Sequence, residues 1–139
     1  MRFMIIVKAT PDTEKNVMPN AEQLTAMGNF NEELVKAGVI LAGEGLLSSD
    51  KGARVRFDDK GKAGQVIDGP FAETKELVAG FWIWQCRSFE EALAWVKRIP
   101  FDSAGEIEIR RVAEVDDFGD AATPEVRAQQ DRLRNATQK

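Results

Sequence analysis

The stretch R-F-M-I-I-V-K, residues 2 to 8, is an apolar run bounded by a basic residue at each end. It is too short for a helix, and no polar residue inside it marks a face turned to solvent. Runs of this kind are typical of a central strand that is buried on both faces. The sequence therefore predicts a sheet built around this strand, with something packed against each side.

Two amphipathic helices are predicted further along the chain. Asn20 and Gln23 have the spacing of a capping box, and apolar residues follow at helical intervals up to a glycine suited to end the helix. Ser88 and Glu91 repeat the capping pattern before a second apolar face, which predicts a helix over residues 89 to 98. Each helix has one face suited to a core.

The remaining segments read as strands with turns between them. Alternation or continuous apolar character predicts the strands, and Gly, Asp and Lys mark the turns. Further strands are expected at residues 39 to 47, 77 to 86 and 106 to 112, and a hairpin is expected from residues 54 to 58 and 65 to 68.

This order predicts an α+β fold: a ferredoxin-like antiparallel sheet with two helices on one face, plus an inserted β-hairpin. The strands at residues 2 to 8 and 81 to 86 are apolar on both faces, whereas two helices cover only one. The other face must therefore meet something hydrophobic. A second copy of the chain is the simplest candidate, so we expect a two-fold homodimer.

Composition excludes several classes of function. The 139 residues suit one domain, and the net charge of −4 argues against binding to nucleic acid. No apolar run is long enough to span a membrane, and the N-terminus lacks a signal-peptide cleavage site, so a cytoplasmic protein is expected. The chain has no histidine and one cysteine, which excludes a disulfide within the chain and histidine-based metal or catalytic sites. We expect no metal site, and acid–base chemistry must use carboxylates, lysine, the thiol or water.

The motif D-G-P-F-A-E-T-K-E, residues 68 to 76, carries more charge than a turn requires. Asp68 is suited to close an Asx-type turn over the Gly-Pro pair that follows it. Glu73, Lys75 and Glu76 are either solvated loop charges or members of a site on a rigid loop. Phe71 is interpreted as a hydrophobic plug for the loop, with a ligand-stacking role as the alternative.

Glu44 is a lone carboxylate in an apolar strand. Counting by twos places it on the face of Ile40, Ala42 and Leu46, between two glycines. A buried carboxylate is costly, so it finds a partner or stays protonated. It is a functional group, half of a structural ion pair, for instance with Arg111, or a solvated residue at a strand end.

Trp82 and Trp84 alternate with smaller apolar residues, so both indoles are expected on one face of their strand. A place in the core or in a dimer interface is one interpretation, and an aromatic wall of a ligand pocket is the other. Cys86 follows on the same face and is expected to be an inert buried thiol.

The motif and its surroundings resemble the DGPF proteins, a branch of the YCII-related family. The order of the opening strand, of A-G-V-I-L-A-G-E-G-L, of F-W-I-W and of I-E-I-R-R-V matches as well. The resemblance implies a dimeric α+β barrel with a cleft near the mouth of each sheet, over a domain of residues 1 to 118. Some relatives carry a His-Asp pair that suggests an enzyme, and this chain lacks the histidine.

Residues 119 to 139 lie outside the resemblance and form a polar C-terminal tail, expected to be partly helical from Thr123-Pro124-Glu125 onward. The tail is interpreted as a frayed helix, with a partner-docking helix as the alternative. Only two apolar residues, Val126 and Leu133, would anchor such a helix.

Two hypotheses about function follow. In the first, the homodimer binds a small molecule near the D-G-P-F loop and acts as a cofactor-independent enzyme, with Glu44 and Asp68 as catalytic acid and base. Its ligand-binding residues would be Phe71, Glu73, Lys75, Glu76, Trp82 and Arg111. In the second, the protein is a regulatory module that binds a basic partner through an acidic loop or its C-terminal tail. The DGPF resemblance implies an extracytoplasmic-function sigma factor as such a partner. The residues specify no cofactor and no substrate.

Overall fold

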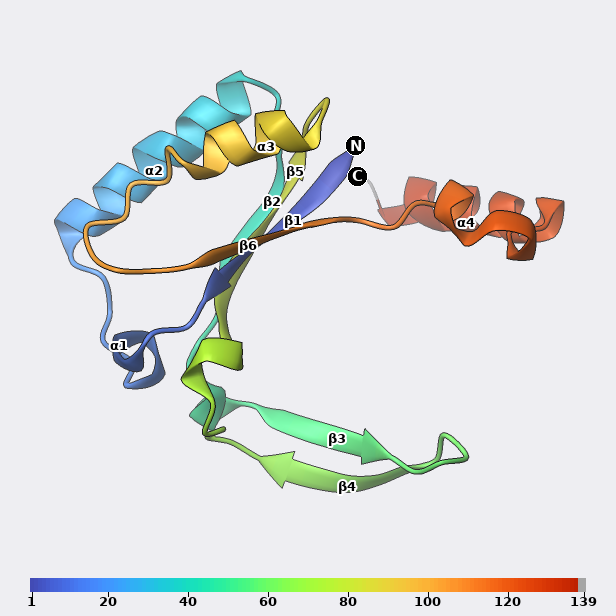
Figure 1. Cartoon of the computed structure of the whole chain (residues 1–139), viewed down its shortest axis with the longest axis horizontal. Helices are drawn as coiled ribbons and strands as arrows, with labels where there is room; N and C mark the ends of the chain where they lie inside the picture. Colours follow the sequence, from blue (N-terminus) through green and yellow to red (C-terminus); the bar gives the residue numbers. More distant parts are fainter. Residues whose placement is uncertain (138–139) are drawn as a thin grey trace.

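A computed structural model describes residues 1 to 137. Two layers make up the body of the molecule, a sheet and the helices on one side of it (Figure 1). The elements in chain order are β1 (Arg2–Lys8), α1 (Pro11–Glu14), α2 (Ala21–Lys36), β2 (Ile40–Gly45), η1 (Ser49–Lys51), β3 (Ala53–Phe57), β4 (Ala63–Asp68), η2 (Thr74–Glu76), β5 (Val78–Gln85), α3 (Phe89–Val96), β6 (Ile107–Arg111), η3 (Val115–Ala121) and α4 (Pro124–Thr137).

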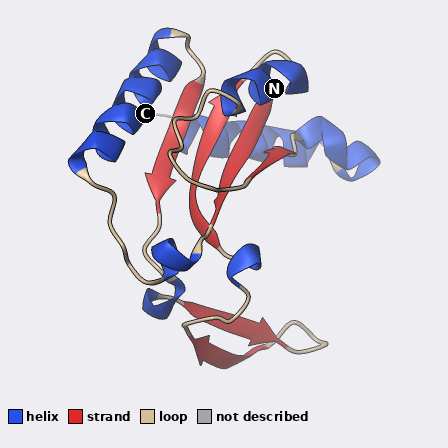
Figure 2. Cartoon of the chain, turned by 60° about the vertical axis from the view of Figure 1, so that its left-hand side comes forward, coloured by secondary structure: helices blue, strands red, loops and turns tan. Residues whose placement is uncertain are grey.

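The main sheet has the strand order β2-β5-β1-β6, and every pairing in it is antiparallel. Strands β3 and β4 form a separate two-stranded hairpin inserted between β2 and β5 (Figure 2). Helices α2 and α3 lie together on one face of the main sheet. The predicted α+β fold with an inserted hairpin is therefore confirmed, and β1 is a central strand as expected.

The core lies between the sheet and its two helices. Phe3 and Ile5 of β1 stand opposite Trp84 and Trp82 of β5, and all four side chains are buried. Leu34 of α2 closes this cluster from the helix side. Each fully buried side chain of this size contributes roughly 1.5–3 kcal/mol.

The expectation that the segment at residues 2 to 8 is buried on both faces is wrong for the single chain. Its burial alternates, with Phe3 and Ile5 buried and Met4 and Ile6 only half-buried. The reason is that both helices cover the same face. The opposite face, called here the outer face, carries the half-buried side chains Met4, Ile6, Phe81 and Ile83.

The helix ends follow the sequence signals closely. The Asn20 side chain accepts a hydrogen bond from the Gln23 amide (2.8 Å), and Gln23 returns one to the Asn20 amide (2.9 Å), which is the predicted capping box. Gly38 has φ +70° just beyond α2, as a helix-ending glycine should. At α3, the Glu91 amide donates to the Ser88 hydroxyl (3.1 Å). The Glu91 carboxylate accepts from the amide of Arg87, the residue before the N-cap, so the predicted capping box is only half formed.

The end of α3 and the segment after β1 also differ from expectation. Helix α3 ends at Val96, two residues short of the predicted end, because the chain turns toward the proline that follows. The segment between β1 and α2, expected to be a loop, contains the short helix α1, which begins with Thr10 as its N-cap. The Thr10 hydroxyl accepts from the Thr13 amide and so starts this turn.

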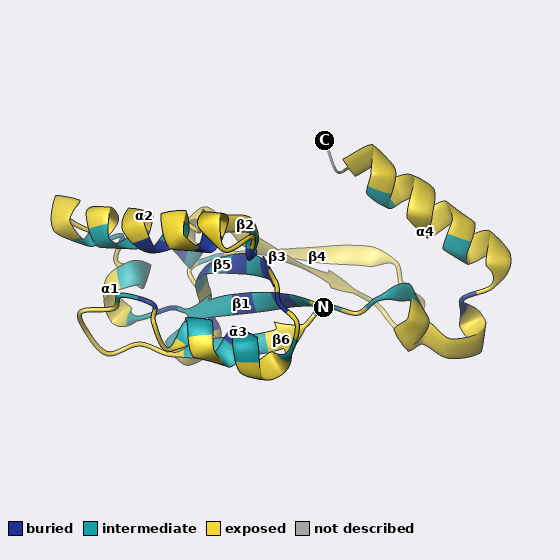
Figure 3. Cartoon of the chain, turned by 90° about the horizontal axis from the view of Figure 1, so that it is seen from above, coloured by how far each residue is buried: buried dark blue, intermediate teal, exposed yellow. Residues whose placement is uncertain are grey.

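The hairpin and the C-terminal helix α4 both project from the outer-face side of the sheet, from opposite ends of it (Figure 1). Both are almost entirely exposed (Figure 3). The outer face therefore lies between these two arms. None of the helices among residues 1 to 137 is both long enough and apolar enough to cross a bilayer.

Strands β2 and β5 approach so closely that one glycine is required. A Cβ on Gly80 would lie 2.9 Å from the Glu44 carbonyl oxygen, which is backbone and has little room to move. Gly80→Ala should therefore destabilise the fold by roughly 1–3 kcal/mol and lower the melting temperature by several degrees. As a control, Gly28→Ala in α2 meets no neighbour within 4 Å and should leave stability equal or higher. Equal melting temperatures for Gly80→Ala and the parent protein would contradict this packing.

Candidate functional site

Glu44 lies on the outer face of the edge strand β2. A bulge at Leu41 shifts the pairing register, so that Ile40 stands opposite Trp84 whereas Ala42 and Glu44 stand opposite Ile83 and Phe81. The prediction that Glu44 shares its face with Ile40 is therefore wrong, because the bulge turns Ile40 to the helix side. Glu44 does share its face with Ala42, as predicted.

The Glu44 side chain is exposed in the single chain and has no hydrogen bond or ion pair within residues 1 to 137. The predicted alternative partner, Arg111, lies on the opposite edge strand β6. Arg111 instead binds Asp117 through both guanidinium nitrogens, at 3.0 and 2.6 Å, and these hydrogen bonds hold the pKa of Asp117 below its usual range. The structure therefore does not bring Glu44 and Arg111 together.

The outer face is apolar in its centre and charged along its β6 edge. Glu108 lies opposite Ile6 and forms ion pairs with Lys8 (3.4 Å) and Arg110 (3.9 Å). Along the β2 edge, Glu44 is the only carboxylate within that strand. A group lying on this face would therefore meet an apolar floor between a paired charge cluster and a carboxylate without a partner.

The D-G-P-F turn is held by a side chain from another part of the chain. The Phe71 amide donates to the Ser49 hydroxyl (3.0 Å), and Gly69 donates to the Gly52 carbonyl (3.0 Å). A Cβ on Gly69 would lie 1.8 Å from the Ser49 carbonyl oxygen, so only glycine fits there. The Asp68 carboxylate accepts no hydrogen bond within residues 1 to 137, and the predicted Asx-type turn is not formed.

Ser49 in turn is fixed by Glu14 at the end of α1. The Glu14 carboxylate accepts from the Ser49 amide (3.0 Å) and from the Ser49 hydroxyl. Next to it, the buried Ser48 hydroxyl donates to Asp50, and this bond, more than the nearby Lys51 charge, lowers the pKa of Asp50. Sequence reasoning missed this polar cluster because its members are far apart in the chain.

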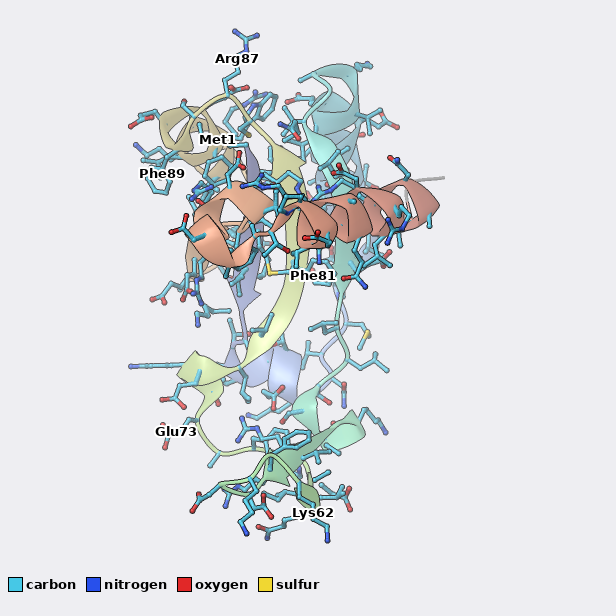
Figure 4. The ribbon with its side chains drawn as sticks, turned by 90° about the vertical axis from the view of Figure 1, so that its right-hand side faces the viewer. Met1, Lys62, Glu73, Phe81, Arg87 and Phe89 are labelled. Carbon is cyan, nitrogen blue, oxygen red and sulfur yellow. The ribbon has the colours of Figure 1, made fainter. Side chains whose placement is uncertain are left out.

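Phe71 is half-buried, and the Arg54 guanidinium lies 3.8 Å from the centre of its ring. The ring is therefore already a stacking surface for a cation of the hairpin, where the sequence interpretation favoured a simple plug. Glu73, Lys75 and Glu76 are exposed around η2, and Figure 4 shows Glu73 pointing away from the body of the protein. Within residues 1 to 137, none of these three side chains forms a hydrogen bond or ion pair with Glu44.

Trp82 and Trp84 both belong to the core. The Trp82 indole nitrogen donates to Asn31 of α2 (2.9 Å), and its ring packs edge-on to Phe30. Trp82 therefore faces the helices, which corrects its proposed place in a ligand-lining wall. Cys86 is buried at the end of β5, and burial raises the pKa of its thiol, as expected for an inert cysteine.

A large hollow lies elsewhere, between the far end of the outer face and α4. This groove, called here the tail groove, has a volume of about 1270 Å³. Its lining is partly apolar and carries charges of both signs, and it includes Arg2, Leu41, Ile83, Glu114, Leu133 and Arg134. In Figure 4, α4 crosses in front of this end of the sheet, with Phe81 just below it.

An ion network attaches α4 beside the groove. Arg2 donates to both oxygens of Glu114 (2.9 and 3.2 Å), and Arg134 of α4 donates to one of them (3.2 Å). The hydrogen bonds from Arg2, aided by the charges of both arginines, hold the pKa of Glu114 below its usual range. The residues 119 to 139 predicted as a tail thus include a helix tied back to β1.

The fold and the motif define a small α+β protein with an antiparallel sheet, an open outer face and a serine-locked D-G-P-F turn. The family model for the YCII-related domain matches residues 1–116, and the chain belongs to this family. The predicted family resemblance is confirmed, and α4 lies beyond the matched residues.

Two individual proteins are also similar. An uncharacterised protein, R00369, of Rhizobium meliloti (strain 1021) is 44% identical over 50 residues, which are 34% of this chain and 40% of that relative's length. The structure of 5-chloro-2-hydroxyhydroquinone dehydrochlorinase (TftG) from Burkholderia phenoliruptrix AC1100, in complex with 2,5-dihydroxybenzoquinone, has a TM-score of 0.48. It is 20% identical and the match covers 82% of this chain and 95% of that chain. Likeness at this level assigns no substrate.

Removing the Ser49 hydroxyl should loosen the D-G-P-F turn. Ser49→Ala leaves the Phe71 amide without its acceptor and removes one of two bonds to Glu14, so we expect a loss of about 1–3 kcal/mol. Amide exchange at Phe71, followed by NMR, should accelerate well beyond the change in global stability. Ser103→Ala, at an exposed loop position, is the matched control. An unchanged exchange rate at the Phe71 amide would mean that the turn stays ordered without the Ser49 hydroxyl.

The attachment of α4 should depend on pH. Because the folded-state pKa of Glu114 is depressed, its ion network stabilises the protein above the unfolded-state pKa and is lost as the pH falls through the folded value. The melting temperature of the parent protein should exceed that of Glu114→Gln at about pH 7, and the difference should shrink as the pH falls below about 4. A difference that stays constant over this range would show that the Glu114 charge does not hold the helix.

Proposed function

We propose that this YCII-family protein is a homodimer that binds a small organic molecule on the outer face, at the end near the D-G-P-F turn. Glu44 and Asp68 would serve as its acid–base pair without a cofactor. The observation that carries the proposal is the unpartnered Glu44 carboxylate beside the apolar floor formed by Phe81 and its neighbours.

The dimer is supported by the one-sided covering of the sheet. Met4, Ile6, Phe81 and Ile83 form a continuous patch by register, since Ile6 pairs with Phe81 and Met4 pairs with Ile83. Monomeric proteins rarely leave a contiguous apolar patch of this kind in water. A two-fold axis lets one such patch cover an identical one.

The acid–base role is supported by what covering this face would do to Glu44. A carboxylate moved from water into an apolar interface is costly unless it gains a partner. Within residues 1 to 137, Glu44 has none, so a bound molecule with a hydrogen-bond donor would supply one. The Asp68 carboxylate has no hydrogen bond to another of residues 1 to 137 either, and Ser49 ties its turn to the segment that follows β2.

The experiment combines light scattering with a thermal-shift screen of common metabolites. We expect a dimer in solution and at least one compound that raises the melting temperature, because a ligand selective for the folded state stabilises it. Glu44→Gln and Asp68→Asn should keep the parent melting temperature without ligand and lose the shift. Glu32→Gln, an exposed carboxylate of α2, should keep the shift.

A shift that survives in both site variants would place the ligand elsewhere and overturn the assignment of these carboxylates. Unfolding of both variants without ligand would assign them structural roles. Silence across the library would favour the second hypothesis, an interaction module for a basic partner such as a sigma factor. Capture of that partner with and without residues 120 to 139 would then test whether the tail binds it.

A further inference from the structure

We propose that the β3–β4 hairpin is an intersubunit arm that packs into the tail groove of a second copy of the chain. The inference rests on the homodimer of the proposed function and adds which surfaces meet. Two observations support it: the hairpin and the tail groove are both exposed in the single chain, and they lie at opposite ends of the outer face.

The hairpin is too exposed to be complete by itself. Along its two strands only Ile67 is even partly buried, and Phe57 and Val66 are 65% and 64% exposed. Val55 stands directly opposite Val66, so these two side chains form one apolar strip on the hairpin. An isolated two-stranded hairpin is marginally stable at best in water, and this one therefore needs a covering surface.

The tail groove offers such a surface. Leu41 on the sheet and Leu133 on α4 face it and are 53% and 52% exposed, with Ile83 on its floor. Helix α4 is held beside the groove by the Arg2–Glu114–Arg134 network rather than by packing. The groove thus has an apolar floor and charged side chains on its walls, and the single chain leaves it open.

Symmetry connects the two surfaces. The hairpin projects at one end of the outer face and α4 at the other, both toward the same side (Figures 1 and 4). When two outer faces meet about a two-fold axis perpendicular to the strands, the ends are exchanged. Each hairpin then lies at the partner's tail groove, and the contact occurs twice, as an isologous interface requires.

Charge favours the same pairing. Residues 54 to 66 of the hairpin contain four basic and two acidic side chains, and residues 114 to 134 contain six acidic and three basic ones. A basic arm beside an acidic tail is attractive, whereas hairpin against hairpin would place like charges together. An axis parallel to the strands would produce that unfavourable arrangement.

Site-directed cross-linking tests the pairing. Phe57→Cys and Leu133→Cys are prepared as separate chains that differ in size, mixed to allow subunit exchange, and treated with a short bismaleimide linker. Both positions are exposed, so the substitutions should not disturb the fold. We expect a mixed covalent dimer to dominate over the products of either variant alone. The native Cys86 is buried, and the parent protein reports any background from it.

Controls distinguish the possible outcomes. Leu24→Cys on α2, an equally exposed position on the helix side, should give no product with Phe57→Cys. A dimer in which Phe57→Cys chains link mainly to each other, or form no covalent product, would overturn the proposed place of the arm. The proposed homodimer would remain intact. A monomer by light scattering would instead overturn the homodimer itself, and the arm with it.

A dissociation measurement gives a second test without cross-linking. Phe57→Ser should raise the dimer dissociation constant at least about tenfold, as expected when a central aromatic anchor of an interface is lost. Val17→Ser, an exposed apolar position in the loop before α2, should leave it unchanged. Equal dissociation constants for the two variants would contradict the proposal.

Discussion

The structure depends on a sheet whose two apolar faces are covered unequally. Helices α2 and α3 bury Phe3, Ile5, Trp82 and Trp84 on one face and leave the other to solvent. The buried half supplies the hydrophobic stabilisation that makes the fold possible. The uncovered half has no partner among residues 1 to 137, and both proposals begin from it.

The second constraint is the way in which short polar contacts hold the irregular parts in place. Ser49 joins α1 to the D-G-P-F turn through Glu14, and Glu114 joins α4 to β1 through two arginines. Neither arm has a core of its own, so these few bonds set where the hairpin and the tail stand. Such attachments are weaker than packing and are the places where pH or a partner can act.

Local patterns were sufficient for the elements and insufficient for the site. The capping pair at Asn20 and the alternation of β5 involve neighbours in sequence, which is why the helices and strands were predicted closely. The face of Ile40 was wrong, because a single bulge reverses a period-two count. The contact between Ser49 and Phe71 spans 22 residues, and no local pattern announces it.

The sequence by itself determined the fold class, the family and the unusual restriction of acid–base chemistry to groups other than histidine, because composition, periodicity and motif are properties of the chain. Tertiary contacts place Trp82 in the core, bind Arg111 to Asp117 and leave Glu44 on the outer face without a side-chain partner among residues 1 to 137. Those outcomes depend on which segments meet in space. Strand register and the placement of two helices on one side of the sheet determine which segments meet. No single stretch of residues specifies either of them.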